Sequence, residues 1–445
     1  MSRTHGLMLM VALAVAPMPA NAQLGSYNPL PGPQETYAIR NVRVVPVTSA
    51  VIENGTVLIS AGKVTAVGTN VTVPAGAHVI DGSGLSVYPG MMDAGTSMGL
   101  SEIPEGANAT MDNSEVGRFN PNVQALNGFN PHSAHIAVTR VVGITQVVSR
   151  PSGGLISGQA GIFTMAGATA PEMAIVPHAA MVIQLPASGF GGGGFGGRGP
   201  GGGANTQDVN RTRERQLDSI RTILRDAEAY GKAQDAWTRD KSLPRPAHDV
   251  VLASLVPVVR GEMPVIFPAE RATDIRGAIA FADELHLKPI ILGGRDALAV
   301  ASLLKEKRVP VVLTHVMDLP SREDDPYDVN WTLPAKLVAA GVQFAITSGD
   351  AGAEARNLPY HAGMAAAFGL SPDDALKSVT LWPAQIFGVA DRVGSIEVGK
   401  MANLVVTTGD MLEARTDTRY LFIDGRLVPL GTKHTELYDM FKERK

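Results

Sequence analysis

Eight short apolar runs, separated by stretches with helical spacing of apolar residues, constrain the fold of this 445-residue chain more than any other feature. The runs lie at residues 86–95, 144–149, 161–167, 180–185, 264–270, 288–294, 309–315 and 342–350. Continuous apolar strands are typical of a parallel sheet that helices cover on both faces. We therefore predict an α/β protein with a (β/α)8 TIM-like barrel over residues 89–390. An open doubly wound sheet is the alternative fold.

The two ends of the chain share a residue pattern that differs from that of the middle. Between residues 37 and 89, valine and isoleucine alternate with polar residues, and glycine or asparagine marks the turns. The same pattern returns near the C-terminus in "GSIEVGKMANLVVTTGD" and "TRYLFIDGRLVPL". Alternation of this kind is typical of short β-strands. We predict one small β-sandwich domain that is assembled from residues 23–88 and 391–445.

The first 22 residues have the features of a signal peptide. A weakly basic start precedes the apolar core "GLMLMVALAVAPM", and "ANA" at residues 20–22 offers the small residues that a signal peptidase requires. The apolar core is too short for a permanent membrane anchor. We expect a secreted chain that begins near Gln23, with the periplasm as its compartment.

Composition excludes several kinds of site and partner. The chain has no cysteine, which rules out disulfides, thiolate metal ligands and cysteine nucleophiles. Its formal net charge of −4 argues against nucleic acid or an anionic membrane surface as an obligate partner. The expected partner is a small-molecule substrate or ligand.

Residues 188–204, "SGFGGGGFGGRGPGGGA", form a low-complexity insertion in the predicted barrel. Such a segment cannot pack into a core, and we predict a flexible surface loop. A phosphate-binding loop is excluded, because no Lys-Ser/Thr pair follows the glycines. A charged, exposed helix is predicted over residues 211–232.

Two motifs carry a resemblance to a known family. They are "VYPGMMDAGTS" at residues 87–97 and "GLSPDDALKSVTLWPAQIFGVADRVGSIEVGKMANLVV" at residues 369–406. With the split β-domain, they make the chain similar to the amidohydrolase superfamily, in particular to secreted relatives of the imidazolonepropionase branch. The similarity extends from about Tyr37 to Leu430. It implies a barrel hydrolase that cleaves amide or cyclic-amide C–N bonds with a metal-bound hydroxide.

The resemblance also implies metal ligands at the ends of the barrel strands, and most of those positions are substituted here. No lysine or glutamate follows the run at 180–185, and of the implied ligands only Asp350 remains. A catalytic zinc requires several imidazole or carboxylate donors. We therefore expect no metal cofactor beyond one weakly held zinc ion. The substituted positions are Gly95, Ser97, Pro268 and Gly293 or Gly294.

Three polar residues end predicted barrel strands and are the catalytic candidates. Glu270 ends the fifth strand, His315 the seventh and Asp350 the eighth. A ring of these side chains would act as acid and base without a metal, with Asp350 as the general base, or would bind one ion weakly. The alternative is that they bond only to loop backbones.

Four further residues are candidates for substrate binding. Arg356, Tyr360 and His361 follow Asp350 closely in sequence, and an arginine beside an aspartate either binds a ligand carboxylate or pairs with that aspartate. Ser157 lies in the glycine-rich stretch "GGLISGQAG", which by the resemblance lies beside the substrate opening.

Three functions fit these observations. The chain is a hydrolase with a degraded metal site, a catalytically silent subunit that pairs with an intact paralogue, or a periplasmic protein that binds a small molecule. A homodimer or a heterodimer with such a paralogue is compatible with the resemblance. Fold alone does not choose among the three.

Overall fold

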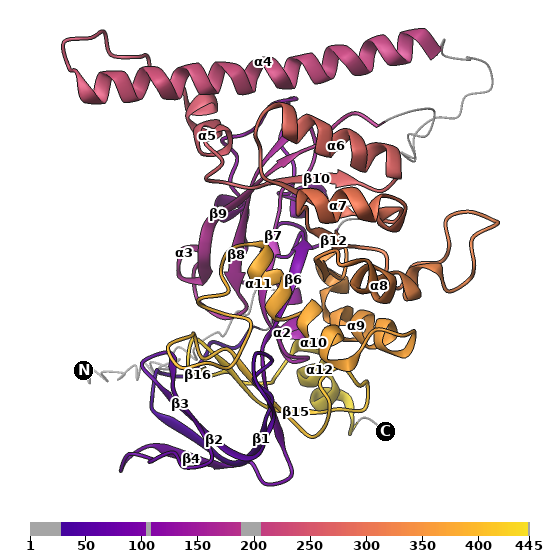
Figure 1. Ribbon diagram of the computed structural model, residues 1–445. Coiled ribbons are helices and arrows are strands. Elements are labelled where there is room, and N and C mark those ends of the chain that lie inside the picture. Colours follow the sequence, from indigo (N-terminus) through magenta and orange to yellow (C-terminus); the bar gives the residue numbers. More distant parts are fainter. Residues whose placement is uncertain (1–27, 104–107, 188–205, 444–445) are drawn as a thin grey trace, which may run out of the picture.

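The computed structural model describes residues 28–103, 108–187 and 206–443 (Figure 1). The predicted signal peptide at residues 1–22 and the glycine-rich segment at residues 188–204 lie outside the described residues. Within the described ranges, no helix combines the length and the apolar character that crossing a membrane requires.

The central element is one eight-stranded sheet that curves into a barrel (Figure 1). Its first and last strands, β6 and β13, lie beside each other, so that the barrel is nearly closed. The predicted α/β barrel with eight strands is confirmed. In sheet order the strands are β6 (Met91–Thr96), β7 (Ile144–Ser149), β8 (Ile156–Thr164), β9 (Ala174–Ile183), β10 (Val265–Ala269), β11 (Pro289–Gly293), β12 (Val311–Leu313) and β13 (Phe344–Ile346).

The third strand departs from the expected parallel arrangement. Strand β8 runs antiparallel to both of its neighbours, β7 and β9. Only residues 150–155 separate β7 from β8, and this connection is too short for the crossover that parallel strands need. Seven strands are therefore parallel, and the third position of the barrel is filled by an antiparallel strand.

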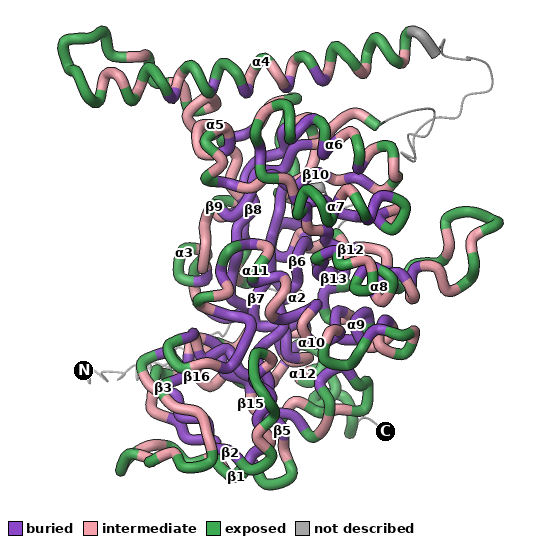
Figure 2. Tube along the Cα trace, in the orientation of Figure 1, coloured by how far each residue is buried: buried purple, intermediate pink, exposed green. Residues whose placement is uncertain are grey.

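Apolar side chains fill the barrel on both sides of its wall, and the wall is almost entirely buried (Figure 2). The cluster inside the barrel includes Met92, Val148, Leu292 and Val312. A second cluster, between the strands and the helices, includes Met91, Val147, Ile291 and Val311. Successive residues of one strand thus face opposite sides, as the pleat of a β-strand requires.

The seam between β6 and β13 is bridged by side chains. The buried Asp93 carboxylate accepts hydrogen bonds from the hydroxyl groups of Thr347 and Ser348, and from the Ser348 N–H at 3.3 Å. Burial raises the pKa of this carboxyl, although the hydrogen bonds from Ser348 and Thr347 act in the opposite direction. Asp93 therefore ties the first strand to the residues that follow the last strand.

Helices surround the barrel, mainly along the second half of the chain (Figure 1). The 34-residue helix α4 (Thr206–Arg239) crosses one end of the molecule and packs on α5. It includes the predicted charged helix at residues 211–232. The other helices are η1 (Asn108–Thr110), α1 (Ala125–Gly128), α2 (Ala134–Arg140), α3 (Ala170–Met173), α5 (Val250–Val259), α6 (Ala272–Glu284), η2 (Ala297–Val300), α7 (Ala301–Lys307), α8 (Val329–Ala340), η3 (Gly352–Asn357), α9 (Leu358–Ala367), α10 (Pro372–Ser378), α11 (Leu381–Ile386) and α12 (Lys433–Phe441).

Local sequence signals set the ends of several of these helices. The Asp249 side chain accepts from the backbone N–H groups of Val251 and Leu252 at the start of α5. Helix α8 ends at Gly341, whose φ of 73° is left-handed and suits a residue without Cβ.

The remaining strands form a second sheet, which joins the two ends of the chain. Its strands are β1 (Tyr37–Val44), β2 (Ile52–Ser60), β3 (Lys63–Gly68), β4 (His78–Asp81), β5 (Ser86–Pro89), β14 (Leu404–Thr407), β15 (Thr418–Ile423) and β16 (Arg426–Leu427). The predicted β-domain built from both termini is confirmed. Its strands are linked in one hydrogen-bonded sheet, in which β5 and β14 join the two ends of the chain. The predicted domain boundaries stay predictions.

Candidate active site at the carboxyl ends of the barrel strands

Polar side chains follow several of the parallel strands at the same end of the barrel. Active sites of such barrels form where the carboxyl ends of the strands meet. The side chains there fall into two groups, one around Arg150 and Asp350 and the other around His315. The residues that follow β6, β7, β10, β12 and β13 in this way are Ser97, Arg150, Glu270, His315 and Asp350.

The first group is an ion pair between Arg150 and Asp350. Arg150 follows β7 and its side chain is 6% exposed, whereas the Asp350 side chain is 75% exposed. Burial lowers the pKa of the guanidinium to about 10, so that it remains a cation at neutral pH. A fixed positive charge therefore lies inside this end of the barrel, and its carboxylate partner reaches it from the solvent side.

Gly95 lies next to this guanidinium. A Cβ atom built on Gly95 would lie 3.9 Å from Arg150 Nε and 3.2 Å from Leu292 Cδ1. Gly95 itself offers no side-chain donor to a metal ion. The space that a side chain at position 95 would enter thus borders an arginine and an aliphatic side chain.

Ser97 fixes the loop that carries Asp350. The Ser97 N–H and hydroxyl both donate to the Asp350 carbonyl oxygen, at 2.8 and 2.6 Å. The hydroxyl of Ser97 is thereby engaged with backbone. Its role in this structure is to position Asp350.

The second group is a chain of hydrogen bonds through His315. The imidazole Nε2 lies 2.6 Å from Glu270 Oε1, and Nδ1 contacts the Asp318 carboxylate. Burial lowers the pKa of His315, but the hydrogen bonds to Asp318 and Glu270 outweigh burial and raise the pKa to about 9. At neutral pH the ring is an imidazolium that donates from both nitrogens.

This geometry corrects the predicted ring of Glu270, His315 and Asp350. Glu270 and His315 do meet, but Asp318 takes the place that was assigned to Asp350. Both ring nitrogens of His315 are engaged by carboxylates, so that neither is directed at Asp350. With its raised pKa, the ring is a cation at neutral pH.

Gly293 makes room for the Glu270 carboxylate. Its φ is 111°, and a Cβ at this position would lie 2.3 Å from Glu270 Oε1 and 2.8 Å from Oε2. Any larger side chain would therefore displace the carboxylate. Pro268, within β10, lines the neighbouring cavity with a ring that has no donor atom.

No group of three or more His, Asp or Glu side chains is arranged to hold a metal ion anywhere in the described ranges. The His315 group illustrates the reason. Its two carboxylates bind opposite nitrogens of one ring, which point away from each other, so that no single ion contacts all three.

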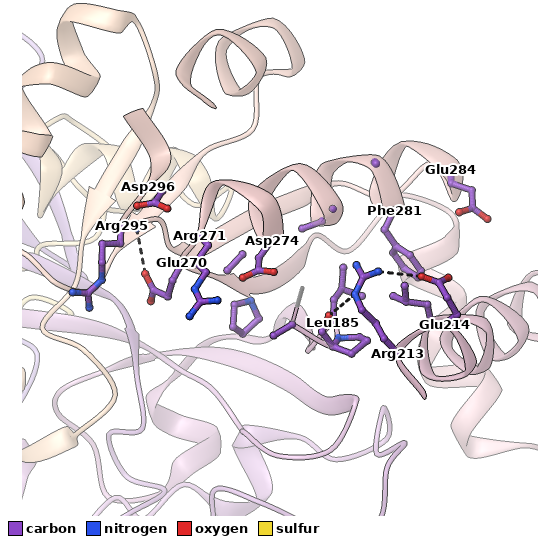
Figure 3. A pocket seen from close by; sticks show the side chains of 18 of the residues that line it. Leu185, Arg213, Glu214, Glu270, Arg271, Asp274, Phe281, Glu284, Arg295 and Asp296 are labelled. Atoms are coloured by element: carbon purple, nitrogen blue, oxygen red, sulfur yellow. Dashed lines mark hydrogen bonds and ion pairs between the residues drawn. The ribbon is translucent and has the colours of Figure 1, made fainter. Parts of the chain in front are cut away.

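A cavity of about 730 Å³ opens beside Glu270 (Figure 3). Figure 3 shows Arg271 and Asp274 between Glu270 at one end and Phe281 and Glu284 at the other. Helices α4 and α6 form its walls, together with the ends of β9 and β10. Its size suits a small organic molecule.

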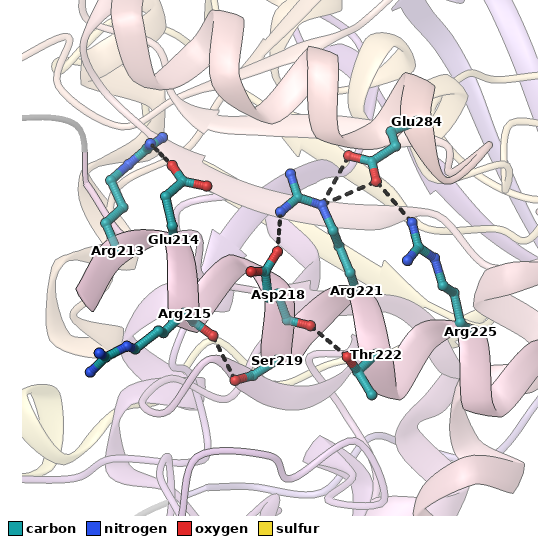
Figure 4. A network of polar contacts seen from close by, with 9 residues as sticks. All are labelled: Arg213, Glu214, Arg215, Asp218, Ser219, Arg221, Thr222, Arg225 and Glu284. Atoms are coloured by element: carbon teal, nitrogen blue, oxygen red, sulfur yellow. Dashed lines mark hydrogen bonds and ion pairs between the residues drawn. The ribbon is translucent and has the colours of Figure 1, made fainter. Parts of the chain in front are cut away.

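Ion pairs hold α4 against α6 along this cavity (Figure 4). Glu284 of α6 binds Arg221 Nε at 3.0 Å and Arg225 Nη2 at 3.2 Å. Arg221 also contacts Asp218 at 2.8 Å. These charges are mutually neutralised, so that they shape the wall of the cavity without adding a net field.

The predicted binding residues do not gather around Asp350. Arg356 forms no ion pair with Asp350, since Arg150 takes that role. Tyr360 is 38% exposed on α9. His361 on the same helix is 6% exposed, and burial lowers its pKa to about 4, so that this ring is neutral. Ser157 is fully buried in β8.

Several buried polar atoms near these strand ends lack a hydrogen-bond partner within the described part of the chain. An unsatisfied buried polar atom costs about 1–3 kcal/mol, and it indicates a place for a ligand or water. Two of the atoms belong to the predicted residues Ser157 and His361. The set is Arg150 Nε, Ser157 Oγ, Thr314 Oγ1 and His361 Nδ1.

Sequence reasoning missed Arg150, Asp318 and Thr314. Arg150 follows the run "ITQVVS" directly, so that its place at a strand end was readable from the sequence. Asp318 stands three residues after His315, in a loop whose course no local pattern predicts. Thr314 has no chemical signature beyond its position.

Comparison with known proteins finds a matching family profile and similar solved structures. Residues 265–428 match the profile described as "Amidohydrolase family". The crystal structure of an amidohydrolase from Thermotoga maritima MSB8 is similar with a TM-score of 0.77 and 27% identity, over 88% of this chain and 99% of that chain.

Two relatives of known sequence are also similar. Amidohydrolase tasK of Hapsidospora irregularis is 24% identical over 411 residues, 83% of this chain. Imidazolonepropionase of Erwinia tasmaniensis is 53% identical over 38 residues, 8% of this chain. The chain spans 39% of the first relative and 9% of the second.

Proposed function

We propose that this chain is a member of the amidohydrolase superfamily that hydrolyses amide or cyclic-amide C–N bonds without a pair of metal ions, which the match of residues 265–428 and the similar Thermotoga maritima structure support. Membership of the imidazolonepropionase branch is part of the proposal, and the sequence similarity that supports it covers 38 residues. The degraded metal site is also proposed, on the grounds that Gly95, Pro268 and Gly293 offer no side-chain ligand.

The observation that carries the proposal is the Arg150–Asp350 pair beside Gly95. A metal ion in a hydrolase supplies positive charge next to the scissile carbonyl and raises the acidity of water. Here a buried guanidinium supplies positive charge, and the carboxylate beside it is exposed enough to contact water. Charge stabilisation is strongest in a site from which water is excluded.

The proposed reaction uses these two residues. Asp350 accepts a proton from a water molecule, whose oxygen attacks the amide carbonyl carbon. The guanidinium of Arg150 donates to the oxyanion that forms. The C–N bond then breaks, and the proton held by Asp350 passes to the departing nitrogen. The cavity beside Glu270 is lined by neither Arg150 nor Asp350, and it has no part in these proposed steps.

The group around His315 has a supporting role in this proposal. Since the imidazolium is already protonated and both carboxylates bind it, none of the three is the base. His315 instead fixes the two carboxylates in place at this end of the barrel. Export to the periplasm is proposed from the first 22 residues alone.

The test is hydrolysis of a panel of amide and cyclic-amide compounds by the purified chain after treatment with a chelator. We expect activity to survive chelation, and Asp350→Asn and Arg150→Gln to lower kcat by about 10²–10⁴-fold. Arg215→Gln, an exposed arginine on α4, is the control for loss of one positive charge. Activity that requires added zinc, or that persists in Asp350→Asn, contradicts the proposal.

A binding protein is the second candidate function. It is favoured by the pairing of Asp350 with Arg150, which engages the carboxylate that hydrolysis would need as a base. This candidate predicts that a panel compound binds without turnover, which calorimetry and product analysis separate. A silent subunit would instead co-purify with a paralogue that has intact histidines.

A further inference from the structure

A second cavity, of about 190 Å³, lies between α2, η3 and α12. It shares no residue with the cavity beside Glu270. Segments from three distant parts of the sequence meet there, since α2 contacts both η3 and α12. We call it the basic pocket, and its lining is Ala134, His135, Val138, Thr139, Ala353, Arg356, Lys433 and His434.

The basic pocket has an unusual balance of charge for this molecule. Four of its eight lining residues are basic, and none is Asp or Glu. The chain as a whole is acidic, with a net charge of −4. Along α4, by contrast, arginines are matched by carboxylates, as in the contacts of Arg221 with Glu284 and Asp218.

Two of the basic side chains are available to a ligand. Arg356 and His434 form no ion pair with an acidic side chain within the described ranges. His135 has one ring nitrogen engaged, because Nε2 lies 2.9 Å from the Glu102 carbonyl oxygen. A carbonyl only accepts, so Nε2 is the donor, and Nδ1 of His135 remains for another contact.

The His135 ring also lies 4.0 Å from a Glu102 carboxylate oxygen, whereas no acidic side chain lines the pocket itself. A cavity lined by basic side chains favours an anion as its ligand. A guanidinium binds the oxygens of phosphate or carboxylate through paired hydrogen bonds, and a group with two negative charges gains most from several cations.

We propose that the basic pocket binds a phosphate-type oxyanion, either free phosphate or the phosphate group of a larger molecule. Its volume of about 190 Å³ admits a tetrahedral anion with a few waters, since one water takes about 30 Å³. Arg356 binds the oxygens through its guanidinium, and the rings of His135 and His434 line the same cavity. This site is independent of the proposed hydrolysis.

Occupancy of the pocket has a structural consequence. η3 begins two residues after Asp350, so that an anion bound to Arg356 braces the segment that carries this carboxylate. On the other side lies α12, which has no buried residue of its own. The anion thus clamps the C-terminal helix to α2 and η3.

Titration of the purified chain with inorganic phosphate, followed by calorimetry at constant ionic strength, tests the proposal. We expect saturable binding that chloride does not reproduce, and an affinity at least about tenfold lower in Arg356→Gln and in His434→Gln. Arg215→Gln removes the same charge on exposed α4 and is expected to bind as the unaltered chain does. Phosphate binding that equals chloride binding, or that survives in both pocket variants, overturns the proposal.

Two further measurements complete the test. A phosphate monoester such as glycerol phosphate distinguishes the sources: equal binding indicates a phosphate group of a larger molecule, and binding of inorganic phosphate alone indicates the free ion. Limited proteolysis reports on the clamp, and phosphate is expected to slow cleavage within α12 several-fold in the unaltered chain but not in Arg356→Gln. Cleavage that phosphate leaves unchanged contradicts the clamp. Far-UV circular dichroism confirms that each variant is folded.

Discussion

His315 shows how one side chain at a strand end is held as a cation at neutral pH. It lies between two carboxylates, and its own side chain is 26% exposed. Arg150 reaches the same condition differently, since burial lowers its pKa only to about 10 and Asp350 neutralises it from outside. At both positions the protein carries positive charge where it could otherwise carry a metal ligand.

The raised pKa of His315 predicts a pH dependence of stability. The folded-state pKa of about 9 exceeds the unfolded value near 6.5, so the folded state holds a proton that the unfolded state releases between these values. The stabilisation is therefore complete below about pH 6.5 and is lost as the pH rises through about 9. After screening by solvent we expect about 1–2 kcal/mol. Urea unfolding at pH 6 and pH 9.5 measures it, and the difference should shrink in His315→Gln.

Gly293→Ala is expected to disrupt the same group. The new Cβ would collide with the Glu270 carboxylate, and the left-handed φ adds backbone strain, for a loss of about 2–4 kcal/mol in the free energy of unfolding. Gly84→Ala is the matched control, because Gly84 also has a left-handed φ of 76° but no atom within 4 Å of its Cβ position. Equal losses in the two variants would show that strain alone matters at position 293.

Residue types at strand ends were predictable, whereas their partners were not. Glu270, His315 and Asp350 were each identified from the sequence as the last polar residue of an apolar run. Whether Asp350 meets Arg150 or His315 depends on the paths of loops after different strands. Those paths follow from packing across the barrel, which no local pattern encodes.

At the scale of elements, the side chain of Asp93 closes the barrel between β6 and β13, which are not paired as neighbouring strands of the sheet. β6 and β13 are the two ends of the sheet, and Asp93 spans them. The eight apolar runs predicted the strands but not the direction of β8. An apolar run carries no information on whether its strand is parallel or antiparallel to its neighbours. The short connection from β7 to β8 was the available signal for an antiparallel turn.

Removal of the Asp93 carboxylate should open this seam. In Asp93→Ala the buried Ser348 hydroxyl loses its acceptor, and the Thr347 hydroxyl keeps only the Gly95 carbonyl oxygen at 3.2 Å, so that we expect a loss of about 2–4 kcal/mol in the free energy of unfolding. Asp93→Asn keeps one oxygen acceptor and should lose less. Urea unfolding of both variants provides the measurement, and a loss under about 1 kcal/mol in Asp93→Ala would mean that the seam is held by other contacts.

At the scale of the whole molecule, the chain combines an eight-stranded barrel with a sheet built from both of its ends. The apolar runs predicted the barrel, and the alternating pattern at the two ends predicted the composite β-domain. Neither pattern could predict the basic pocket, which forms where three remote segments meet.

The substituted ligand positions predict that the purified protein contains little metal. After mild dialysis, elemental analysis should find far less than one zinc ion per chain, with an affinity no better than micromolar. Added zinc or a chelator should leave the thermal unfolding temperature unchanged. One or two tightly held ions per chain would contradict the degraded metal site.

The sheet that joins the two ends of the chain has a consequence for biosynthesis. Strand β5 pairs with β14, and the Thr407 hydroxyl bonds to the Ser86 carbonyl oxygen across 321 residues of sequence. During translation β1 to β5 can pair with one another, but β5 emerges long before its other partner β14 exists. Contacts so remote form slowly, because the intervening chain must first be brought to order. A chain released before residue 404 would therefore keep the edge of β5 unpaired and exposed.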